Sequence, residues 1–296
     1  MNRLNLRSRT DGVASLRSAD ATDSPPGLNP SGETISLRRS EGAPLDAWCY
    51  RPAGWTEPRA TLVSVHGVSR NSREHLVAWM PYADHFGLQL VTPDFSSRAF
   101  HGYQRLDLGR GGESPDELLA ELLERLPELA GFEHRPTCLA GFSGGAQFAH
   151  RFLLTHPRAV HAAVLTAAGW WTLPTAGLQF PHGCGQTRQK PGVHFDPLAW
   201  VRIPLLVTVG DRDTERDSNL RQDPFTDSQQ GVHRIERAAR WAKQIQSLAQ
   251  EHGVQSQVRF EVLPGAGHDF MECMAAGLGD QAMALLQDHD GFPAIF

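Results

Sequence analysis

The chain has 296 residues, of which 40% are hydrophobic, and its formal net charge is −5. This apolar fraction is enough to bury a core, and the mild negative charge argues against nucleic acid or an anionic membrane surface as a partner. The four cysteines are scattered, with no C-x-x-C pair, which disfavours a metal knuckle and predicts reduced thiols in a cytoplasmic protein. A Cys184–Cys273 bridge stays open at this stage. The cysteines are Cys49, Cys138, Cys184 and Cys273.

The first thirty residues contain no apolar run long enough for a signal-peptide core or a membrane span. They are rich in Ser, Arg and Asp and include the breaker Pro25-Pro26-Gly27. Such a composition cannot bury enough apolar surface to fold, so we expect residues 1–30 to form a mobile tail. The arginines also fit an organelle-targeting peptide, although the acidic residues in the same stretch weaken that alternative. Residues 31–296 are predicted to form a single domain.

From residue 33 onward, strand-like and helix-like segments alternate. Two strands flank a turn at Glu41-Gly42, and short β-branched runs then predict buried strands. A helix is expected before most of the later strands, which implies right-handed βαβ units and a mostly parallel sheet with helices on both faces. The expected strands are 33–51 (two), 60–67, 88–95, 135–142, 159–169, 202–213 and 256–268. The expected helices are 73–86, interrupted at Pro81, then 114–129, 144–157, 231–253 and 269–287. Residues 172–200, rich in Gly, Pro and Gln, are predicted to be an irregular cap-like excursion.

The stretch Gly141-Phe-Ser143-Gly144-Gly145 joins a predicted strand to a predicted helix. Glycines two positions before and two after a serine let strand and helix approach closely, and they allow a strained backbone that exposes the hydroxyl. The N–H of Gly144 can then donate to the oxyanion of a tetrahedral intermediate. The pattern G-x-S-x-G is short, and the alternative is a Gly-rich turn without chemistry.

Three further segments follow predicted strands at the edge where an open α/β sheet binds its ligands. His66 and Gly67 end the segment 60–67, and the loop that starts there can bring the N–H of Val68 toward the serine, while the His66 side chain is expected to hold the loop by hydrogen bonds. Asp211 and Asp213 lie at the carboxyl end of the strand segment 202–213, and either carboxylate can orient a histidine. His268 lies in a Gly-rich loop after the last strand.

The order Ser, Asp, His at the ends of successive strands resembles that of the α/β-hydrolase family, over most of residues 60–287. The resemblance implies that Ser143 is the nucleophile, that Val68 and Gly144 supply the oxyanion hole, and that His268 is the base. The family's Gly-x-x-Asp pattern falls on Gly210 to Asp213, which favours Asp213 over Asp211. The absence of a Gly run after His66 is a departure from the lipases and esterases built on such a run, and the short cap disfavours families with a full helical lid. In its general layout the chain looks most similar to polyhydroxybutyrate-depolymerase-like and feruloyl-esterase-like hydrolases.

Two segments near the predicted cleft could contact the substrate and select it. Trp170 and Trp171 follow the strand beside the elbow, and we expect Trp170 to face the acyl group and Trp171 to face the core; the alternative is that both pack the excursion onto the sheet. The loop after the strand at 88–95 carries arginines that suit an acidic group, although solvated loop arginines are the commoner outcome. They are Arg98, Arg105 and Arg110.

The predicted function is hydrolysis of carboxylic esters through an acyl-enzyme, on a small-molecule or polymer ester. Peptide cleavage or cofactor-free perhydrolysis on the same three residues is one alternative, and a binding protein without turnover is another. No metal constellation and no phosphate-cradling loop stand out, so no metal and no cofactor are expected. The sequence does not define the oligomeric state.

Overall fold

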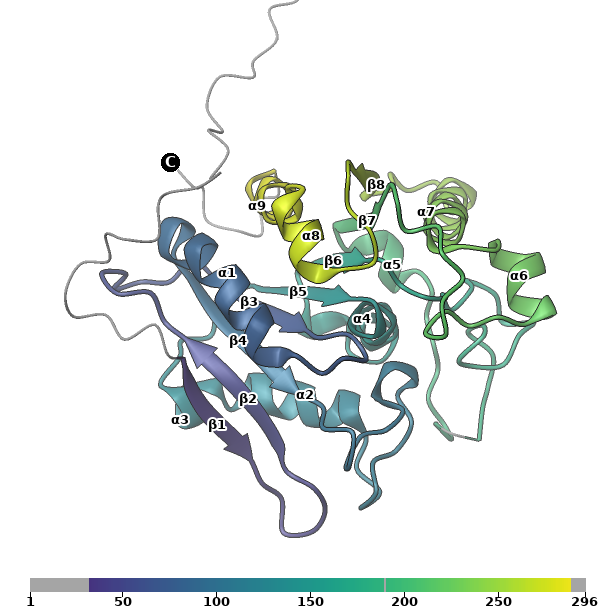
Figure 1. Cartoon of the computed structure of the whole chain (residues 1–296). Coiled ribbons are helices and arrows are strands. Elements are labelled where there is room, and N and C mark those ends of the chain that lie inside the picture. The colour runs from purple at the N-terminus through teal and green to yellow at the C-terminus, as the bar shows by residue number, and fades with distance from the viewer. Residues whose placement is uncertain (1–31, 189, 289–296) are drawn as a thin grey trace, which may run out of the picture.

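The computed structural model describes residues 32–188 and 190–288, and the predicted tail at 1–30 lies outside this range. An eight-stranded sheet runs in the order β1-β2-β4-β3-β5-β6-β7-β8 (Figure 1). Strand β2 pairs antiparallel with β1 and with β4, and every other neighbouring pair is parallel. The mostly parallel sheet predicted from the alternating segments is therefore confirmed. The strands are β1 Glu33–Leu37, β2 Leu45–Tyr50, β3 Ala60–Val65, β4 Leu88–Asp94, β5 Thr137–Phe142, β6 Ala162–Thr166, β7 Leu205–Gly210 and β8 Val258–Leu263.

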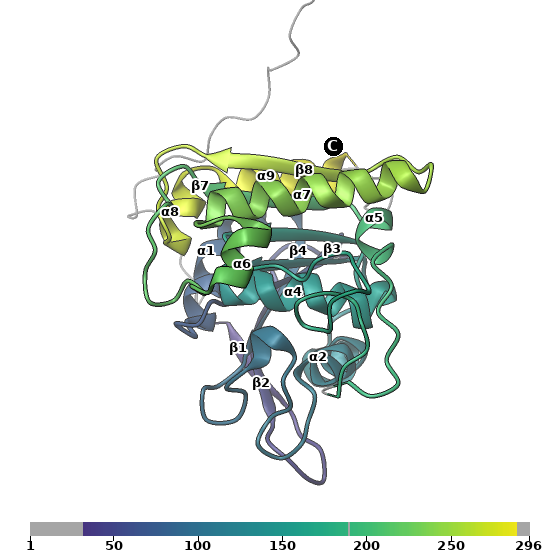
Figure 2. The ribbon, with the colours of Figure 1, turned by 90° about the vertical axis from the view of Figure 1, so that its right-hand side faces the viewer.

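Helices cover both faces of the sheet, as the two perpendicular views show (Figures 1 and 2). One face carries α1, α8 and α9, and the other carries α2, α4, α5 and α7. Every residue of β3, β5, β6 and β7 is buried, as expected of parallel strands between two helical layers. The helices are α1 Ser72–Phe86, α2 Pro115–Glu124, α3 Leu126–Ala130, α4 Gly144–Thr155, α5 Ala199–Arg202, α6 Pro224–Gln230, α7 Arg234–Glu251, α8 Phe270–Ala275 and α9 Leu278–Gln287.

The predicted interruption of the first helix is wrong, because α1 continues through Pro81. Proline removes one intrahelical hydrogen bond, the bond to the carbonyl of Val77. Both residues lie on the exposed side of the helix, where water can bind that carbonyl. The proline is therefore tolerated without a break.

Two other predicted helices are each divided in the structure. The segment 114–129 forms α2 and α3, which meet at Arg125. Pro127 has no N–H to donate to the carbonyl of Leu123, four residues earlier, so the run of helical hydrogen bonds is interrupted here. The segment 269–287 forms α8 and α9, separated by Gly277 at φ 98°. Helix α6 was not predicted.

The excursion between β6 and α5 is irregular, as predicted, apart from an isolated bridge between Gln179 and Gly185. A buried ion pair fixes it to the sheet's helical layer: Lys190 Nζ lies 2.5 Å from Oδ1 of Asp116, the second residue of α2. All four cysteines are free and buried, so the Cys184–Cys273 bridge is not formed. Within residues 32–188 and 190–288, no helix is long and apolar enough to cross a membrane.

Candidate active site

Ser143 lies on a tight turn between β5 and α4, with backbone angles φ 52° and ψ −111°. A side-chain-bearing residue rarely adopts a positive φ, and such strain persists only where the surroundings enforce it. The neighbouring glycines show how close the backbones come. A Cβ on Gly145 would lie 2.0 Å from the carbonyl oxygen of Val65, and one on Gly141 would lie 2.4 Å from the carbonyl of Gly145. The glycines therefore permit the turn that presents the serine.

Ser143, His268 and Asp213 form one hydrogen-bonded chain. Ser143 Oγ lies 3.0 Å from His268 Nε2, and His268 Nδ1 lies 2.7 Å from Asp213 Oδ2. Asp213 is almost fully buried at 1% exposure, whereas the imidazole keeps partial access to solvent. An ionised Asp213 can only accept a hydrogen bond, so it pairs with an Nδ1–H of His268, which leaves Nε2 free to accept a hydrogen bond from the serine hydroxyl.

Asp211 has a different role from Asp213. Its Oδ1 accepts a hydrogen bond from the backbone N–H of Gly265 at 2.8 Å, so it braces the turn before His268. The same two loops are joined by a hydrogen bond from Arg212 N–H to the carbonyl of Ala266 at 3.0 Å. The geometry thus places Asp213, and not Asp211, on the imidazole.

The second oxygen of Asp213 binds a buried arginine that the sequence reasoning missed. Arg234 Nη1 lies 3.0 Å from Asp213 Oδ1 and 2.9 Å from Asp217 Oδ2, and the arginine is 1% exposed. Burial raises the pKa of Asp217, but its hydrogen bonds and charge interaction with Arg234, and two backbone N–H groups, hold that pKa below the ordinary value. Arg234 fixes the orientation of the Asp213 carboxylate. The available signal was its position on the apolar stripe of α7, in line with Ala238 and Trp241.

The loop after β3 runs beside the serine. A Cβ on Gly67 would lie 3.4 Å from Ser143 Cβ, and one on Gly144 would lie 3.3 Å from the backbone nitrogen of Val68. As the first residue of α4, Gly144 has no intrahelical acceptor for its N–H. The two backbone donors predicted from the sequence are therefore neighbours at the serine.

His66 holds this loop in place, as the sequence predicts. Its Nδ1 lies 2.8 Å from the carbonyl oxygen of Gly67, and its Nε2 accepts the backbone N–H of Phe95 at 3.1 Å. Burial lowers the pKa of His66 to about 4, so the ring is neutral at pH 7 with its proton on Nδ1. Tyr103 completes the arrangement by donating its hydroxyl to the carbonyl of His66 at 2.7 Å.

The two tryptophans after β6 have different surroundings. Trp171 is fully buried and stacks on Trp241 with ring centroids 4.4 Å apart, so it is a core residue in this structure. Its backbone N–H and C=O are both bound by the side-chain amide of Gln230, at 2.8 and 2.9 Å. Trp170 is 5% exposed, and its ring is contacted by the guanidinium groups of Arg151 and Arg221.

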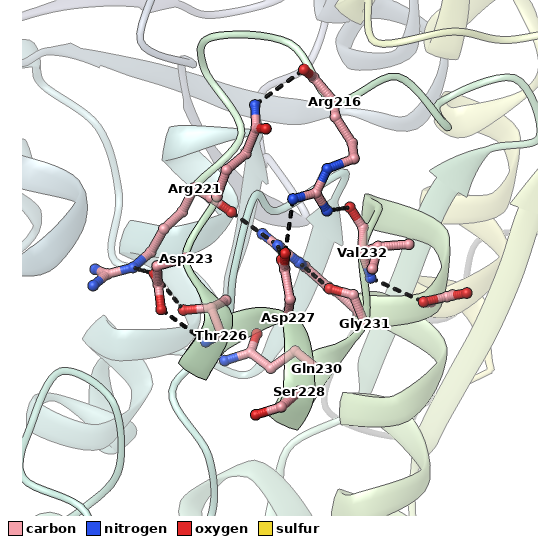
Figure 3. Close-up of polar contacts among 12 residues, drawn as sticks. Arg216, Arg221, Asp223, Thr226, Asp227, Ser228, Gln230, Gly231 and Val232 are labelled. Atoms are coloured by element: carbon pink, nitrogen blue, oxygen red, sulfur yellow. Dashed lines mark hydrogen bonds and ion pairs between the residues drawn. The ribbon is translucent and has the colours of Figure 1, made fainter.

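The connection between β7 and α7, which carries Asp213, is braced by its own polar network (Figure 3). Arg216 donates to the carbonyl of Val232 at 2.6 Å and to Asp227 at 2.7 Å. Asp223 caps helix α6 by accepting the backbone N–H of Thr226 at 2.9 Å. Arg237 of α7 donates to Asp227 at 2.7 Å and to the carbonyl of Arg221 at 2.8 Å, so the connection is also tied to α7.

Comparison with known proteins supports the same architecture. No protein-family model and no curated protein matches this chain. Among solved structures, a poly(3-hydroxybutyrate) depolymerase from Bordetella parapertussis is 28% identical and aligns over 86% of this chain and 94% of its own, with a TM-score of 0.69. Poly(aspartic acid) hydrolase-1 from Sphingomonas sp. KT-1 is 24% identical over 86% and 100%, with a TM-score of 0.73. A thermophilic esterase from Thermogutta terrifontis is 15% identical over 89% and 96%, with a TM-score of 0.57.

Proposed function

We propose that this chain, which has the α/β-hydrolase fold of the structures it resembles, is a serine hydrolase that cleaves carboxylic esters through an acyl-enzyme. The observation that carries the proposal is the hydrogen-bonded chain from Ser143 Oγ through His268 to Asp213, with contacts of 3.0 and 2.7 Å. The similarity to a depolymerase at 28% identity favours an ester over other acyl compounds. The feruloyl-esterase-like subgroup remains a prediction from the sequence.

In the proposed mechanism, His268 Nε2 takes the proton of Ser143 as Oγ attacks the ester carbonyl. Asp213 keeps the imidazole in the tautomer that can accept this proton and stabilises the imidazolium that forms. The N–H groups of Val68 and Gly144 donate to the oxyanion, and each is worth on the order of 3 kcal/mol in other oxyanion holes. His268 then protonates the leaving alcohol. In the second half of the reaction, His268 takes a proton from water as the water attacks the acyl-enzyme, and it protonates Ser143 Oγ as the acid is released.

A substrate panel tests this function. We expect turnover of p-nitrophenyl esters, with a burst of p-nitrophenol equal to one per active site wherever deacylation is slower than acylation. Acyl-peptides and peroxide-dependent halogenation are measured beside them, because these reactions use the same three residues. Turnover confined to the peptides or to the peroxide assay would contradict the ester assignment, and a His268→Ala variant that retains wild-type rates would contradict the mechanism.

A further inference from the structure

A row of three side chains leads away from Ser143 along helix α4. Ser143, Gln147 and Arg151 are four residues apart, and residues at this spacing share one face of a helix with their side chains tilted toward its N-terminus. Consistent with this, Arg151 Nη1 reaches back to the carbonyl of Gln147 at 3.3 Å. One helical turn is about 5–6 Å long, so Gln147 begins about one turn from the serine.

Arg151 is buried, and no carboxylate among the described residues forms a hydrogen bond or ion pair with it. Its side chain has no exposed surface, and its hydrogen bonds go to three neutral oxygens: Thr172 Oγ1 at 2.9 Å and the carbonyls of Gln104 and Gln147. Its Nη2 is buried and has no hydrogen-bond partner among the described residues. A buried charge is costly unless it is paired, so this guanidinium favours a negative group close by that the described residues do not supply.

A second arginine meets the first across Trp170. The guanidinium carbons of Arg151 and Arg221 lie 4.2 and 4.8 Å from the centroid of the Trp170 ring. Arg221 is anchored through Nε, which lies 2.5 Å from Oδ2 of Asp223, and its terminal nitrogens point away from that network (Figure 3). Its side chain is 38% exposed, so a ligand can reach those nitrogens from solvent.

The charges around this cluster do not cancel. Burial holds the pKa of Arg151 well below its usual range; Arg105 and Arg221 lower it further, and only Asp107 opposes them. Arg105 pairs with Asp107 and Arg221 pairs with Asp223, which leaves the charge of Arg151 in excess. Like charges held together without full compensation favour binding of an anion.

We propose that Arg221, Gln147 and the edge of Trp170, backed by Arg151, form a subsite for a carboxylate on the substrate. Gln147 is 6% exposed, and its buried Oε1 has no partner among the described residues. Because Oε1 is the buried end of this amide, the NH₂ is the end that can donate to a carboxylate one turn from the serine. The inference rests on the proposed function and narrows it to esters that carry an anionic group a few bonds from the scissile carbonyl.

The test uses esters that differ only in that group. On the acyl side, mono-p-nitrophenyl adipate is compared with p-nitrophenyl methyl adipate, in which a methyl ester replaces the carboxylate. On the alcohol side, the butyrate ester of 6-hydroxyhexanoic acid is compared with that of its methyl ester. We expect the wild type to prefer the anionic member of at least one pair by about tenfold or more in kcat/KM, because charge-assisted hydrogen bonds are the strong ones. The preference should shrink as salt is raised.

Arg221→Gln should bring that preference close to one, and Arg221→Lys should retain part of it. The matched control is Arg216→Gln, which removes an arginine of similar exposure from the same connection and should keep the preference of the wild type. Thermal unfolding of each variant separates loss of recognition from loss of fold. Equal rates within both ester pairs, or a preference that survives Arg221→Gln, would overturn the subsite.

A different result identifies failure of the proposed function. If no ester of either pair is cleaved, the esterase assignment fails, and binding of free adipate is then measured by calorimetry on the wild type and on Arg221→Gln. Binding that is weakened about tenfold in the variant would support the subsite without any turnover. Binding that is equal in the two proteins, or absent from both, would overturn it.

Discussion

The buried pair between Asp116 and Lys190 gives a prediction whose size follows from the structure. Asp116 Oδ1 accepts hydrogen bonds at 2.5 Å from Lys190 Nζ and from the Ser114 hydroxyl. The two charged side chains are only 1% and 6% exposed. Asp116→Asn leaves an unpaired buried ammonium group, and breaking a buried pair in this way costs about 3–5 kcal/mol. Because Lys190 belongs to the excursion at residues 172–200, the excursion should pack less tightly against α2 in the Asp116→Asn variant.

The pH dependence of this effect has a definite sign. Burial raises the pKa of Asp116, but the charge and hydrogen bond of Lys190, aided by Ser114 and His156, outweigh burial and hold that pKa below its ordinary value of 3.8. A carboxyl whose pKa is lower in the folded state stabilises the protein above its unfolded pKa and loses this contribution as the pH falls through the folded pKa. The difference between wild type and Asp116→Asn should therefore be constant from pH 7 to about 5 and narrow below about 4.

Urea unfolding at pH 7 and at pH 3.5 measures both effects. The double variant Asp116→Leu/Lys190→Met is the control, because apolar replacement of both partners removes the unpaired charge and should recover much of the loss. A loss below about 1 kcal/mol for Asp116→Asn at pH 7 would refute the reasoning from burial. A difference that does not narrow at acidic pH would refute the reasoning from the lowered pKa.

Three further substitutions test the site and its frame. Asp213→Asn should lower kcat by roughly 10⁴, while Asp211→Asn should have a small effect in the same ester assay. A larger loss for Asp211→Asn than for Asp213→Asn would contradict the assignment of Asp213 as the acid. Trp171→Ala should cost about 3–5 kcal/mol in urea unfolding as a buried aromatic truncation, and a loss under 1 kcal/mol would place its ring outside the core. Gly145→Ala should cost about 3 kcal/mol or more, because its Cβ would lie 2.0 Å from the carbonyl of Val65; wild-type stability would disprove that close approach.

The sheet, and the approach of Ser143, His268 and Asp213 to one another, were predictable because both depend on short patterns in the sequence. Buried β-branched runs mark the central strands, and Gly141 and Gly145 frame a serine only where strand and helix backbones meet. The choice of Asp213 over Asp211 came from the resemblance to the α/β-hydrolase family, whose Gly-x-x-Asp pattern falls on Gly210 to Asp213. These signals lie within short segments of the chain, so a single sequence carries them.

The features that escaped prediction depend on contacts between distant segments. Arg234 binds Asp213 across 21 residues of chain, and Arg151 binds the carbonyl of Gln104 across 47 residues. An arginine on the apolar stripe of a helix signals burial, but it does not name its partner. The continuation of α1 through Pro81 was missed because the exposure of that side of the helix depends on how the helix docks.

Labelling of the serine tests the central claim most directly. The wild-type protein is treated with a fluorophosphonate probe, and the adduct is located by mass spectrometry of its peptides. One adduct on Ser143 is expected, with none in a Ser143→Ala variant whose circular dichroism and thermal unfolding match the wild type. An adduct on another residue, or equal labelling of the folded Ser143→Ala protein, would contradict the assignment of Ser143 as the nucleophile.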